Sequence, residues 1–322
     1  MADPNFEKLA EKANAYKLAS LGTTAPPATE AFSSADIESA KKAAAIRAVG
    51  DHFDPSAKYV GIGSGTTIVY VVEAIKNLNI DVSTINFVPT GYQSRQVIVR
   101  AGLTPASFTD LPAGILMDVA FDGADEIDAD LNCIKGGGAC LYQEKLVATH
   151  AKKFICVADH RKLQDRLLTN WPTIPIEVEP QAVRVVEAAL RELGSPNPQL
   201  RESSMQKAGP VKTDQGFYIV DAPFEPLMLQ REVDKALSLH PAHQGATGMG
   251  EDGKWEVKNL ARAIKMIEGV LSVGIFSGEN GEEIAARGVL QGGQKPVAAY
   301  FGMPDGSVVS RKAGHEPEEL KR

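Results

Sequence analysis

The sequence has few of the residues that hold disulfide-bonded or metal-dependent proteins together. It contains three cysteines, Cys133, Cys140 and Cys156, and neither their odd number nor their spacing fits a disulfide framework or a zinc site. None of the six histidines belongs to a set of metal ligands with recognisable spacing. We therefore expect a reducing compartment, in which the three thiols are packing residues or incidental.

Long apolar runs are also missing, so no segment is predicted to span a membrane. The first residues lack the apolar core of a signal peptide, and their acidic residues suit a transit peptide poorly. We expect residues 1–32 to form a flexible extension, with a short docking helix over residues 6–18 as the alternative. A cytoplasmic location follows from these features. The net charge of −7 and the pI of about 5.5 argue against a nucleic-acid partner.

Two carboxylates follow an apolar run in the middle of the chain. Residues 117–121 predict a buried strand that ends at Asp122. Ligands of open α/β sheets bind beyond the carboxyl ends of the strands, so we expect Asp122 and Asp125 at the mouth of a cleft. Each could instead cap a turn, and taken alone neither interpretation is favoured. A calcium loop starting at Asp128 is excluded, because its sixth and twelfth positions lack the required glycine and glutamate.

A lysine, three glycines and a glutamate come next. Lys135 precedes the glycines 136–138, whose backbone freedom lets successive N–H groups point at one spot and hold a developing oxyanion. A helix predicted over residues 139–150 places Glu144 about two turns in, where a carboxylate could act as a general base. A solvated helix face is the alternative for Glu144 alone. The combination favours an active site for proton transfer on a small polar substrate.

A second glycine motif lies upstream. Residues 58–62 read as a strand that leads through a Gly-Ser-Gly turn into an apolar helix over residues 68–78, a geometry that holds phosphate against backbone N–H groups. The dinucleotide fingerprint is incomplete, because Thr66 stands where its third glycine belongs, and no Gly-Lys-Ser/Thr follows. The hydroxyls of Ser64, Thr66 and Thr67 suit a single phosphate ester. A tight turn with hydroxyl caps is the alternative.

The order of predicted elements indicates an α/β protein with a Rossmann-like layered sheet and a second, smaller α+β lid domain. We expect the first domain to comprise residues 33–172 and 277–322, and the second to comprise residues 173–276. The predicted helices cover 36–52, 93–101, 182–193, 226–237 and 259–267, and the further strands cover 85–88, 217–220, 270–276 and 296–301. The last strand is expected to complete the first sheet.

The chain resembles the type A ribose-5-phosphate isomerases, in particular their longer eukaryotic forms. The resemblance rests on the motifs at 61–67, 121–127, 134–139 and 144–145, on 154–159 with Lys162, and on 216–221 and 267–276. They follow the family order over most of the chain from about residue 35 onward.

The resemblance implies an enzyme that interconverts D-ribose 5-phosphate and D-ribulose 5-phosphate through a cis-enediolate in the non-oxidative pentose phosphate pathway. It implies no metal or other cofactor, a sugar phosphate as the small-molecule partner, and a homodimer or homotetramer. The resemblance assigns Glu144 as the base, and Lys135 with Gly136, Gly137 and Gly138 as oxyanion stabilisers. It assigns Asp122 and Asp125 to the sugar hydroxyls and to ring opening. The phosphate is assigned to Ser64, Gly65, Thr66, Thr67 and Lys162, with Lys41 as a weaker candidate.

Two functions from other classes remain open at this point. A sugar-phosphate sensor would bind without turnover, but such regulators normally carry a DNA-binding helix-turn-helix, and the first sixty residues show no basic recognition helix. An amino-sugar-phosphate deaminase or lactone hydrolase would use a water-activating base with a histidine beside it. His150 and His160 are the nearby candidates, and neither falls within the acidic motif.

Overall fold

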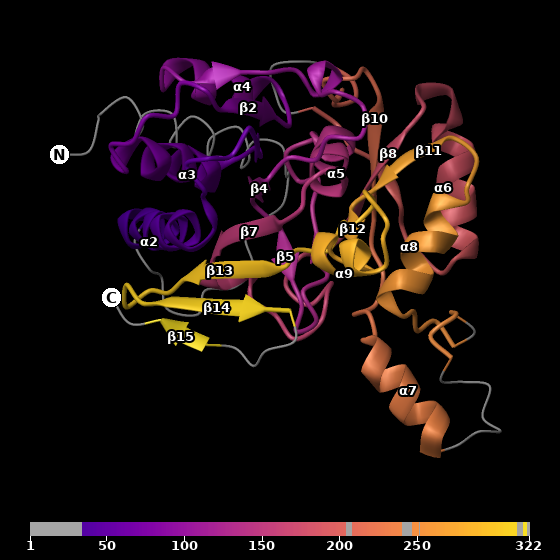
Figure 1. The fold of residues 1–322 in the computed structure, drawn as a ribbon. Coiled ribbons are helices and arrows are strands. Elements are labelled where there is room, and N and C mark those ends of the chain that lie inside the picture. Colours follow the sequence, from indigo (N-terminus) through magenta and orange to yellow (C-terminus); the bar gives the residue numbers. More distant parts are fainter. Residues whose placement is uncertain (1–33, 204–207, 240–246, 251, 314–317, 321–322) are drawn as a thin grey trace. The chain divides into compact units, whose positions relative to one another are not determined.

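The computed structural model describes residues 34–203, 208–239, 247–250, 252–313 and 318–320 (Figure 1). The predicted extension 1–32 and the alternative docking helix within it lie outside the described residues. By internal packing the chain divides into two compact units. The larger unit holds the described residues up to Ala124 together with Gln143–Lys162 and those from Glu279 onward, and the smaller unit holds Asp125–Tyr142 and Leu163–Gly278.

The larger unit is built on an eight-stranded sheet with the order β15-β14-β13-β7-β4-β1-β2-β3. Its strands are β1 (Tyr59–Ile62), β2 (Asn86–Pro89), β3 (Thr104–Pro105), β4 (Val119–Asp122), β7 (Phe154–Asp159), β13 (Ala298–Gly302), β14 (Val308–Lys312) and β15 (Glu318–Leu320). The pairs from β13 to β3 are parallel, and β13–β14 and β14–β15 are antiparallel. The prediction that the strand over residues 296–301 returns to the first sheet is confirmed, because β13 pairs with β7, but β14 and β15, which were not predicted, extend the sheet beyond it.

Helices pack on this sheet through small and branched apolar side chains. They are α2 (Ser34–His52), α3 (Thr66–Asn77), α4 (Tyr92–Arg100) and α5 (Leu141–Thr149), and the unit also contains the short α9 (Gly281–Ala286). The alanines of α2 let its backbone approach β13 so closely that a Cβ built on Gly302 would lie 1.9 Å from the carbonyl oxygen of Ala40. Helix α3 is apolar on nearly all sides and almost wholly buried, as a helix inside a layered core must be. This core fixes the start of α3 beside the end of β1.

The smaller unit contains two antiparallel sheets. One has the order β11-β8-β10-β9, with β8 (Ile174–Val178), β9 (Gln199–Leu200), β10 (Tyr218–Ala222) and β11 (Val270–Val273), and the other has the order β12-β6-β5, with β5 (Glu126–Ile127), β6 (Cys133–Ile134) and β12 (Ile275–Phe276). Its helices are α6 (Val183–Glu192), α7 (Gln230–Leu239) and α8 (Val257–Lys265). Short 3-10 turns lie at Phe108–Asp110 and His160–Lys162 in the larger unit and at Pro180–Ala182 in the smaller one.

The predicted strand over residues 270–276 is two strands, and the break has a packing cause. Gly274 separates β11 from β12, which belong to different sheets. Its N–H donates to the carbonyl oxygen of Pro175 at 2.7 Å, and its own carbonyl oxygen accepts from the N–H of Lys135 at 2.8 Å. A Cβ built at Gly274 would lie 2.5 Å from the Lys135 carbonyl oxygen, so glycine is required here.

The predicted domain boundaries also differ from the observed units. Residues 125–142 and 163–172 pack with the smaller unit, although they were expected in the first domain. The reason is that β5 and β6 form a hairpin whose outer partner is β12, a strand of the smaller unit. None of the helices in the described part of the chain combines the length and hydropathy that a membrane crossing requires.

Candidate active site

Asp122 closes the turn between β1 and α3 in the larger unit. It is the last residue of β4, and its side chain is 3% exposed. One carboxylate oxygen accepts the N–H of Gly123 at 2.7 Å and that of Ser64 at 3.2 Å. The approach is so close that a Cβ built on Gly63 would lie 1.9 Å from this oxygen. Glycine is therefore required at position 63, because any side chain there would collide with the Asp122 carboxylate.

The Gly-Ser-Gly turn itself is held by polar side chains. Gly65 has φ of +102°, and its N–H donates to the side-chain oxygen of Gln93 at 2.8 Å. The hydroxyl of Ser64 is hydrogen-bonded to that of Thr90 at 2.8 Å. Two of the N–H groups expected to cradle a phosphate are thus bonded to Asp122 and Gln93. The first-turn N–H groups of α3, with the buried hydroxyls of Thr66 and Thr67, are the remaining donors of the motif.

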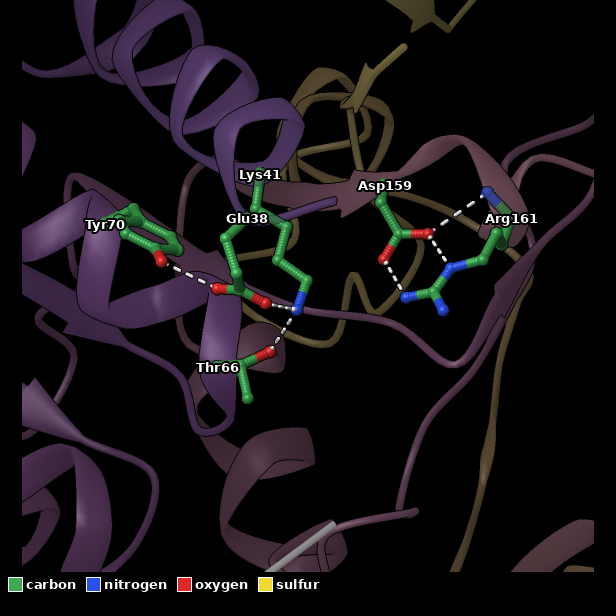
Figure 2. A network of polar contacts seen from close by, with 6 residues as sticks. All are labelled: Glu38, Lys41, Thr66, Tyr70, Asp159 and Arg161. Carbon is green, nitrogen blue, oxygen red and sulfur yellow. Dashed lines mark hydrogen bonds and ion pairs between the residues drawn. The ribbon is translucent and has the colours of Figure 1, made fainter. Parts of the chain in front are cut away.

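A buried lysine on α2 reaches the start of α3 (Figure 2). Lys41 is 3% exposed, and its ammonium donates to the hydroxyl of Thr66 at 2.9 Å and to Glu38 Oε1 at 2.7 Å. The hydroxyl of Tyr70 donates to Glu38 Oε2 at 2.6 Å, so one carboxylate links the lysine and the tyrosine. An ammonium that leaves water needs such partners, because an unpaired buried charge is strongly unfavourable. The chain Tyr70–Glu38–Lys41–Thr66 therefore fixes a positive charge at the N-terminus of α3.

A second charged group stands at the end of β7 (Figure 2). Asp159 accepts from Arg161 Nε at 2.6 Å and from Arg161 Nη2 at 2.9 Å. Burial by itself would raise the pKa of Asp159, but the hydrogen bonds and charge of Arg161, with the charges of Lys162 and Lys41, hold this pKa well below its usual value. Both lysines thus act on the same carboxylate.

Several charges gather around the end of β7. The guanidinium of Arg161 is itself influenced by Glu38 as well as by Asp159, both of which raise its pKa. Three cations, Lys41, Arg161 and Lys162, therefore stand near the carboxylates of Glu38 and Asp159. In a chain with a net charge of −7, this is a local site suited to an anion.

In the smaller unit, Asp125 is bound to the glycine turn. Its carboxylate Oδ2 accepts the N–H of Gly137 at 2.7 Å, and its own N–H donates to the Ile134 carbonyl oxygen at 2.8 Å across the β5–β6 hairpin. A Cβ on Gly137 would lie 2.8 Å from both carboxylate oxygens. Gly136 has φ of +107°, and a Cβ there would lie 2.9 Å from Pro175. The turn therefore requires both glycines, because a larger residue at either position would displace a neighbouring side chain.

Lys135 is held at the end of β6 by its backbone and its side chain. Its N–H donates to Gly274, and its ammonium lies 5.7 Å from the ring centroid of Phe276 on the neighbouring β12. The residue is 3% exposed. An aromatic face stabilises a cation that has lost part of its water. The ring of Phe276 therefore supports the ammonium of Lys135 in a buried place.

Glu144 is buried on α5, at 5% exposed, but in a different register from the prediction. The helix begins at Leu141, so Glu144 lies in its first turn and not two turns in. The delay arises because Ala139 has φ of +59°, a left-handed conformation that cannot begin a helix. The neighbouring Gln143 donates to the carbonyl oxygen of Pro89 at 3.0 Å, which ties α5 to the end of β2. Glu144 is thus carried on a helix anchored to the sheet.

The structure arranges the predicted residues as two groups, one in each unit. In the larger unit, Asp122 is bonded to Ser64 and Lys41 to Thr66, Lys162 acts on the Asp159 carboxylate through its charge, and Glu144 lies on α5. In the smaller unit, Asp125 is bonded to the turn after Lys135. The polar residues that the sequence reading missed are Glu38, Tyr70, Thr90, Gln93, Arg161 and Arg201. The i, i+3 spacing of Glu38 and Lys41 was a readable signal for an ion pair on one helix face. Arg201 lies 65 and 64 residues along the chain from the two glycines that it contacts, so no local sequence pattern indicates its role.

Within the described residues, no group of three or more His, Cys, Asp and Glu side chains is placed to hold a metal ion. Two of the six histidines, His240 and His243, lie outside the described residues.

Comparisons with known proteins agree with one another. A family model for ribose 5-phosphate isomerase A (phosphoriboisomerase A) matches residues 86–242. The ribose-5-phosphate isomerase of Candida albicans is 39% identical over 278 residues, which are 86% of this chain and 97% of that protein. The enzyme of Schizosaccharomyces pombe is 40% identical over 281 residues, 87% of this chain and 85% of that protein.

Two solved structures match over a similar share. Ribose 5-phosphate isomerase A from Methanocaldococcus jannaschii has a TM-score of 0.63 and 28% identity, and the match covers 85% of this chain and 99% of that one. A D-ribose-5-phosphate isomerase in complex with phospho-erythronic acid has a TM-score of 0.62 and 30% identity, over 89% of this chain and 99% of that one.

Proposed function

The chain belongs to the ribose-5-phosphate isomerase A family and interconverts ribose 5-phosphate and ribulose 5-phosphate, and we propose that it does so through a cis-enediolate with Glu144 as the base. Glu144 moves a proton between C2 and C1, so that the carbonyl changes place between the two carbons. The reaction needs one base, one stabiliser for the charge on oxygen and one anchor for the phosphate. The chain offers a residue for each.

The observation that carries this proposal is the buried Lys41–Thr66 contact at the N-terminus of α3. Together with Lys162 and the hydroxyl of Thr67, it provides positive charge and donors for a phosphate dianion. The phosphate lies far from the carbons that react, so its binding orients the sugar and contributes free energy without taking part in the proton transfer.

Lys135 and the glycine N–H groups stabilise the enediolate oxygen. The ammonium of Lys135 is buried and supported by the Phe276 ring, and a charge in such a place acts strongly on a developing anion. Asp122 and Asp125 bind the sugar hydroxyls and assist ring opening. Both are held by backbone N–H groups, which keep a carboxylate oriented. No step in this route requires a metal or an organic cofactor.

The proposal is tested by isomerisation in D2O after treatment with a chelator. Ribose 5-phosphate is converted by the purified protein, and NMR measures deuterium at the isomerised carbon. Metal-independent conversion with solvent deuterium supports proton transfer by an enzyme base. Loss of activity on chelation contradicts metal independence, and conversion without any deuterium favours a hydride shift. Binding without conversion would favour a sugar-phosphate sensor.

The base is tested with Glu144→Gln. General base catalysis contributes roughly 10²- to 10⁴-fold, so kcat is expected to fall by about that factor while the protein stays folded. Glu192→Gln on the exposed end of α6 is the matched control, because it makes the same chemical change away from the proposed residues. A kcat within about twofold of the wild type in Glu144→Gln would remove this residue from the mechanism.

We also propose that the protein works as a homodimer or homotetramer in the cytoplasm, in the non-oxidative pentose phosphate pathway, without nucleic-acid or membrane partners. The support is the family membership, the net negative charge and the small number of cysteines. Light scattering at several protein concentrations tests the oligomeric state, and fractionation of cells tests the location.

A further inference from the structure

Arg201 is a buried side chain that joins a sheet of the smaller unit to the glycine turn. It follows β9 directly and is 6% exposed. Its Nε and Nη2 donate to the Asp221 carboxylate at 2.6 and 2.5 Å. Its Nη1 donates to the carbonyl oxygens of Gly136 at 3.0 Å and Gly137 at 3.3 Å. A single guanidinium therefore holds two successive carbonyl groups of the turn.

The sheet sets the direction of this guanidinium. The N–H of Arg201 donates to the carbonyl oxygen of Ile219 at 2.7 Å, and Asp221 lies two residues further along β10. Residues two apart on a strand share a face, so the carboxylate and the arginine point to the same side. The planar fork of arginine matches a carboxylate with two donors and leaves Nη1 for other acceptors. Lysine has a single ammonium group, so it cannot bind the carboxylate with two donors and the turn with a third.

The glycine turn has a peptide whose orientation its own sequence does not determine. The N–H of Ala139 donates to the Gly136 carbonyl oxygen at 3.1 Å, which closes a four-residue turn with Gly137 and Gly138 in its centre. The two common turn types differ mainly by a flip of the central peptide, and glycine tolerates both. An outside contact must therefore select one orientation.

Arg201 supplies that contact. No cis peptide bond occurs among the described residues, and in a trans peptide the C=O and the following N–H point in opposite directions. Because Nη1 holds the carbonyl oxygens of Gly136 and Gly137, the N–H groups of Gly137 and Gly138 are directed away from the arginine. The N–H of Gly137 meets Asp125 Oδ2 on that side at 2.7 Å. Gly138 is exposed, and its N–H points to the side of the peptide opposite the arginine.

We propose that Arg201 is a positioning residue, which fixes the Gly137–Gly138 peptide so that the Gly138 N–H binds the charged oxygen of the enediolate while Asp125 stays bonded to Gly137. The proposal rests on the proposed function, because it assigns the glycine turn to the oxyanion. Arg201 does not touch the substrate. Without it, the central peptide flips to its other orientation, and one donor to the transition state is lost.

The test compares Arg201→Met and Arg201→Lys with Arg191→Met. Arg191 lies on the exposed face of α6 in the same unit, where it is paired loosely with Glu187 at 3.9 Å, so it controls for the loss of a surface arginine. Loss of one oxyanion donor costs about 10²- to 10³-fold in kcat, and we expect about a hundredfold loss in both Arg201 variants. KM for ribose 5-phosphate is expected to stay within about twofold, because the phosphate contacts are untouched.

Inhibitors separate a positioning role from a structural one. Inorganic phosphate reports on the anion site, and a phosphorylated four-carbon hydroxamate, whose paired oxygens carry charge as an enediolate does, reports on the oxyanion contacts. In the Arg201 variants the hydroxamate is expected to bind about a hundredfold more weakly while the affinity for phosphate is unchanged. Equal weakening of both inhibitors would indicate general damage and overturn the proposal.

Chemical rescue provides the last arm. Guanidinium ion at millimolar concentration is expected to restore part of the kcat of Arg201→Ala, whereas methylammonium, which lacks the fork, is not. If Arg201→Met fails to fold, Arg201→Lys and the rescue carry the test. Wild-type kcat and hydroxamate affinity in Arg201→Lys would refute the proposal. Failure of the proposed function looks different, because the wild-type protein would then show no isomerisation at all.

Discussion

The two central glycines of the turn after Lys135 should respond to alanine in opposite ways. A Cβ at Gly137 would lie 2.8 Å from both oxygens of the Asp125 carboxylate, whereas a Cβ at Gly138 meets nothing within 4 Å. Neither residue has a φ in the left-handed region, so backbone strain does not distinguish them. The difference between Gly137→Ala and Gly138→Ala therefore measures the contact with Asp125.

The size of the effect follows from the geometry. In Gly137→Ala the Asp125 carboxylate must retreat from 2.8 Å to about 3.4 Å, which is the ordinary contact distance, and its 2.7 Å hydrogen bond is stretched. Overpacking of this kind costs about 1–3 kcal/mol, and a weakened hydrogen bond to a charged group is in the same range. In Gly138→Ala the unfolded chain loses entropy with no clash, which stabilises the fold by about 0.4–1 kcal/mol.

Differential scanning calorimetry gives the comparison. At roughly 2–4 °C for each kcal/mol, we expect the Tm of Gly137→Ala to fall by several degrees while that of Gly138→Ala stays equal or rises slightly. The kcat of Gly137→Ala should also fall, by up to about a hundredfold, because a shift of about 1 Å in a catalytic group has effects of that size and the carboxylate retreats by a little over half of that. A Tm for Gly137→Ala equal to or above that of Gly138→Ala would refute the described packing of Asp125 on the turn.

Three further predictions concern the anion site. Lys162→Ala should raise KM much more than it lowers kcat in steady-state kinetics; the reverse pattern would place Lys162 in the chemistry. Tyr70→Phe removes the hydroxyl that holds Glu38 and thereby loosens Lys41, so KM should rise about five- to tenfold while kcat is unchanged. An unchanged KM in Tyr70→Phe would show that Lys41 needs no such support. Asp159 has a lowered pKa in the fold, so the ionised carboxylate stabilises the fold above pH 3.8, its ordinary pKa, and this stabilisation is lost as the pH falls below that value. The difference in urea midpoint between the wild type and Asp159→Asn should therefore shrink below pH 3.8. A constant difference would contradict the pairing of Asp159 with Arg161.

The sequence predicted those parts of the fold whose signal is local. The apolar helix after Thr66 and the strand that ends at Asp122 were readable, because a buried parallel strand is continuously apolar and a turn residue marks its end. Strand β8 was not, because Pro175 lies within it and proline usually ends a strand. The register shows Pro175 opposite Asp221, in a sheet where β8 has neighbours on both sides.

The same division applies to the site. The motif residues were predicted from their types and spacing, since carboxylates, glycines and a lysine within one span have few other uses. The start of α5 was misplaced, because nothing in the sequence required Ala139 to adopt φ of +59°. Arg201 could not be predicted at all, because its contacts with Gly136 and Gly137 depend on the pairing of β9 with β10, which no spacing along the chain reveals.

The position of β13 between β7 and β14 has a consequence for how the protein is made. Strand β7 is complete at Asp159, but the partner that covers one of its edges ends at Gly302 and is therefore made much later. Until then the nascent chain presents an apolar strand edge of the kind that pairs with other chains. Cells that make this protein must therefore protect that edge until β13 has been made, and a nonsense mutation shortly before residue 298 would leave a product prone to aggregate.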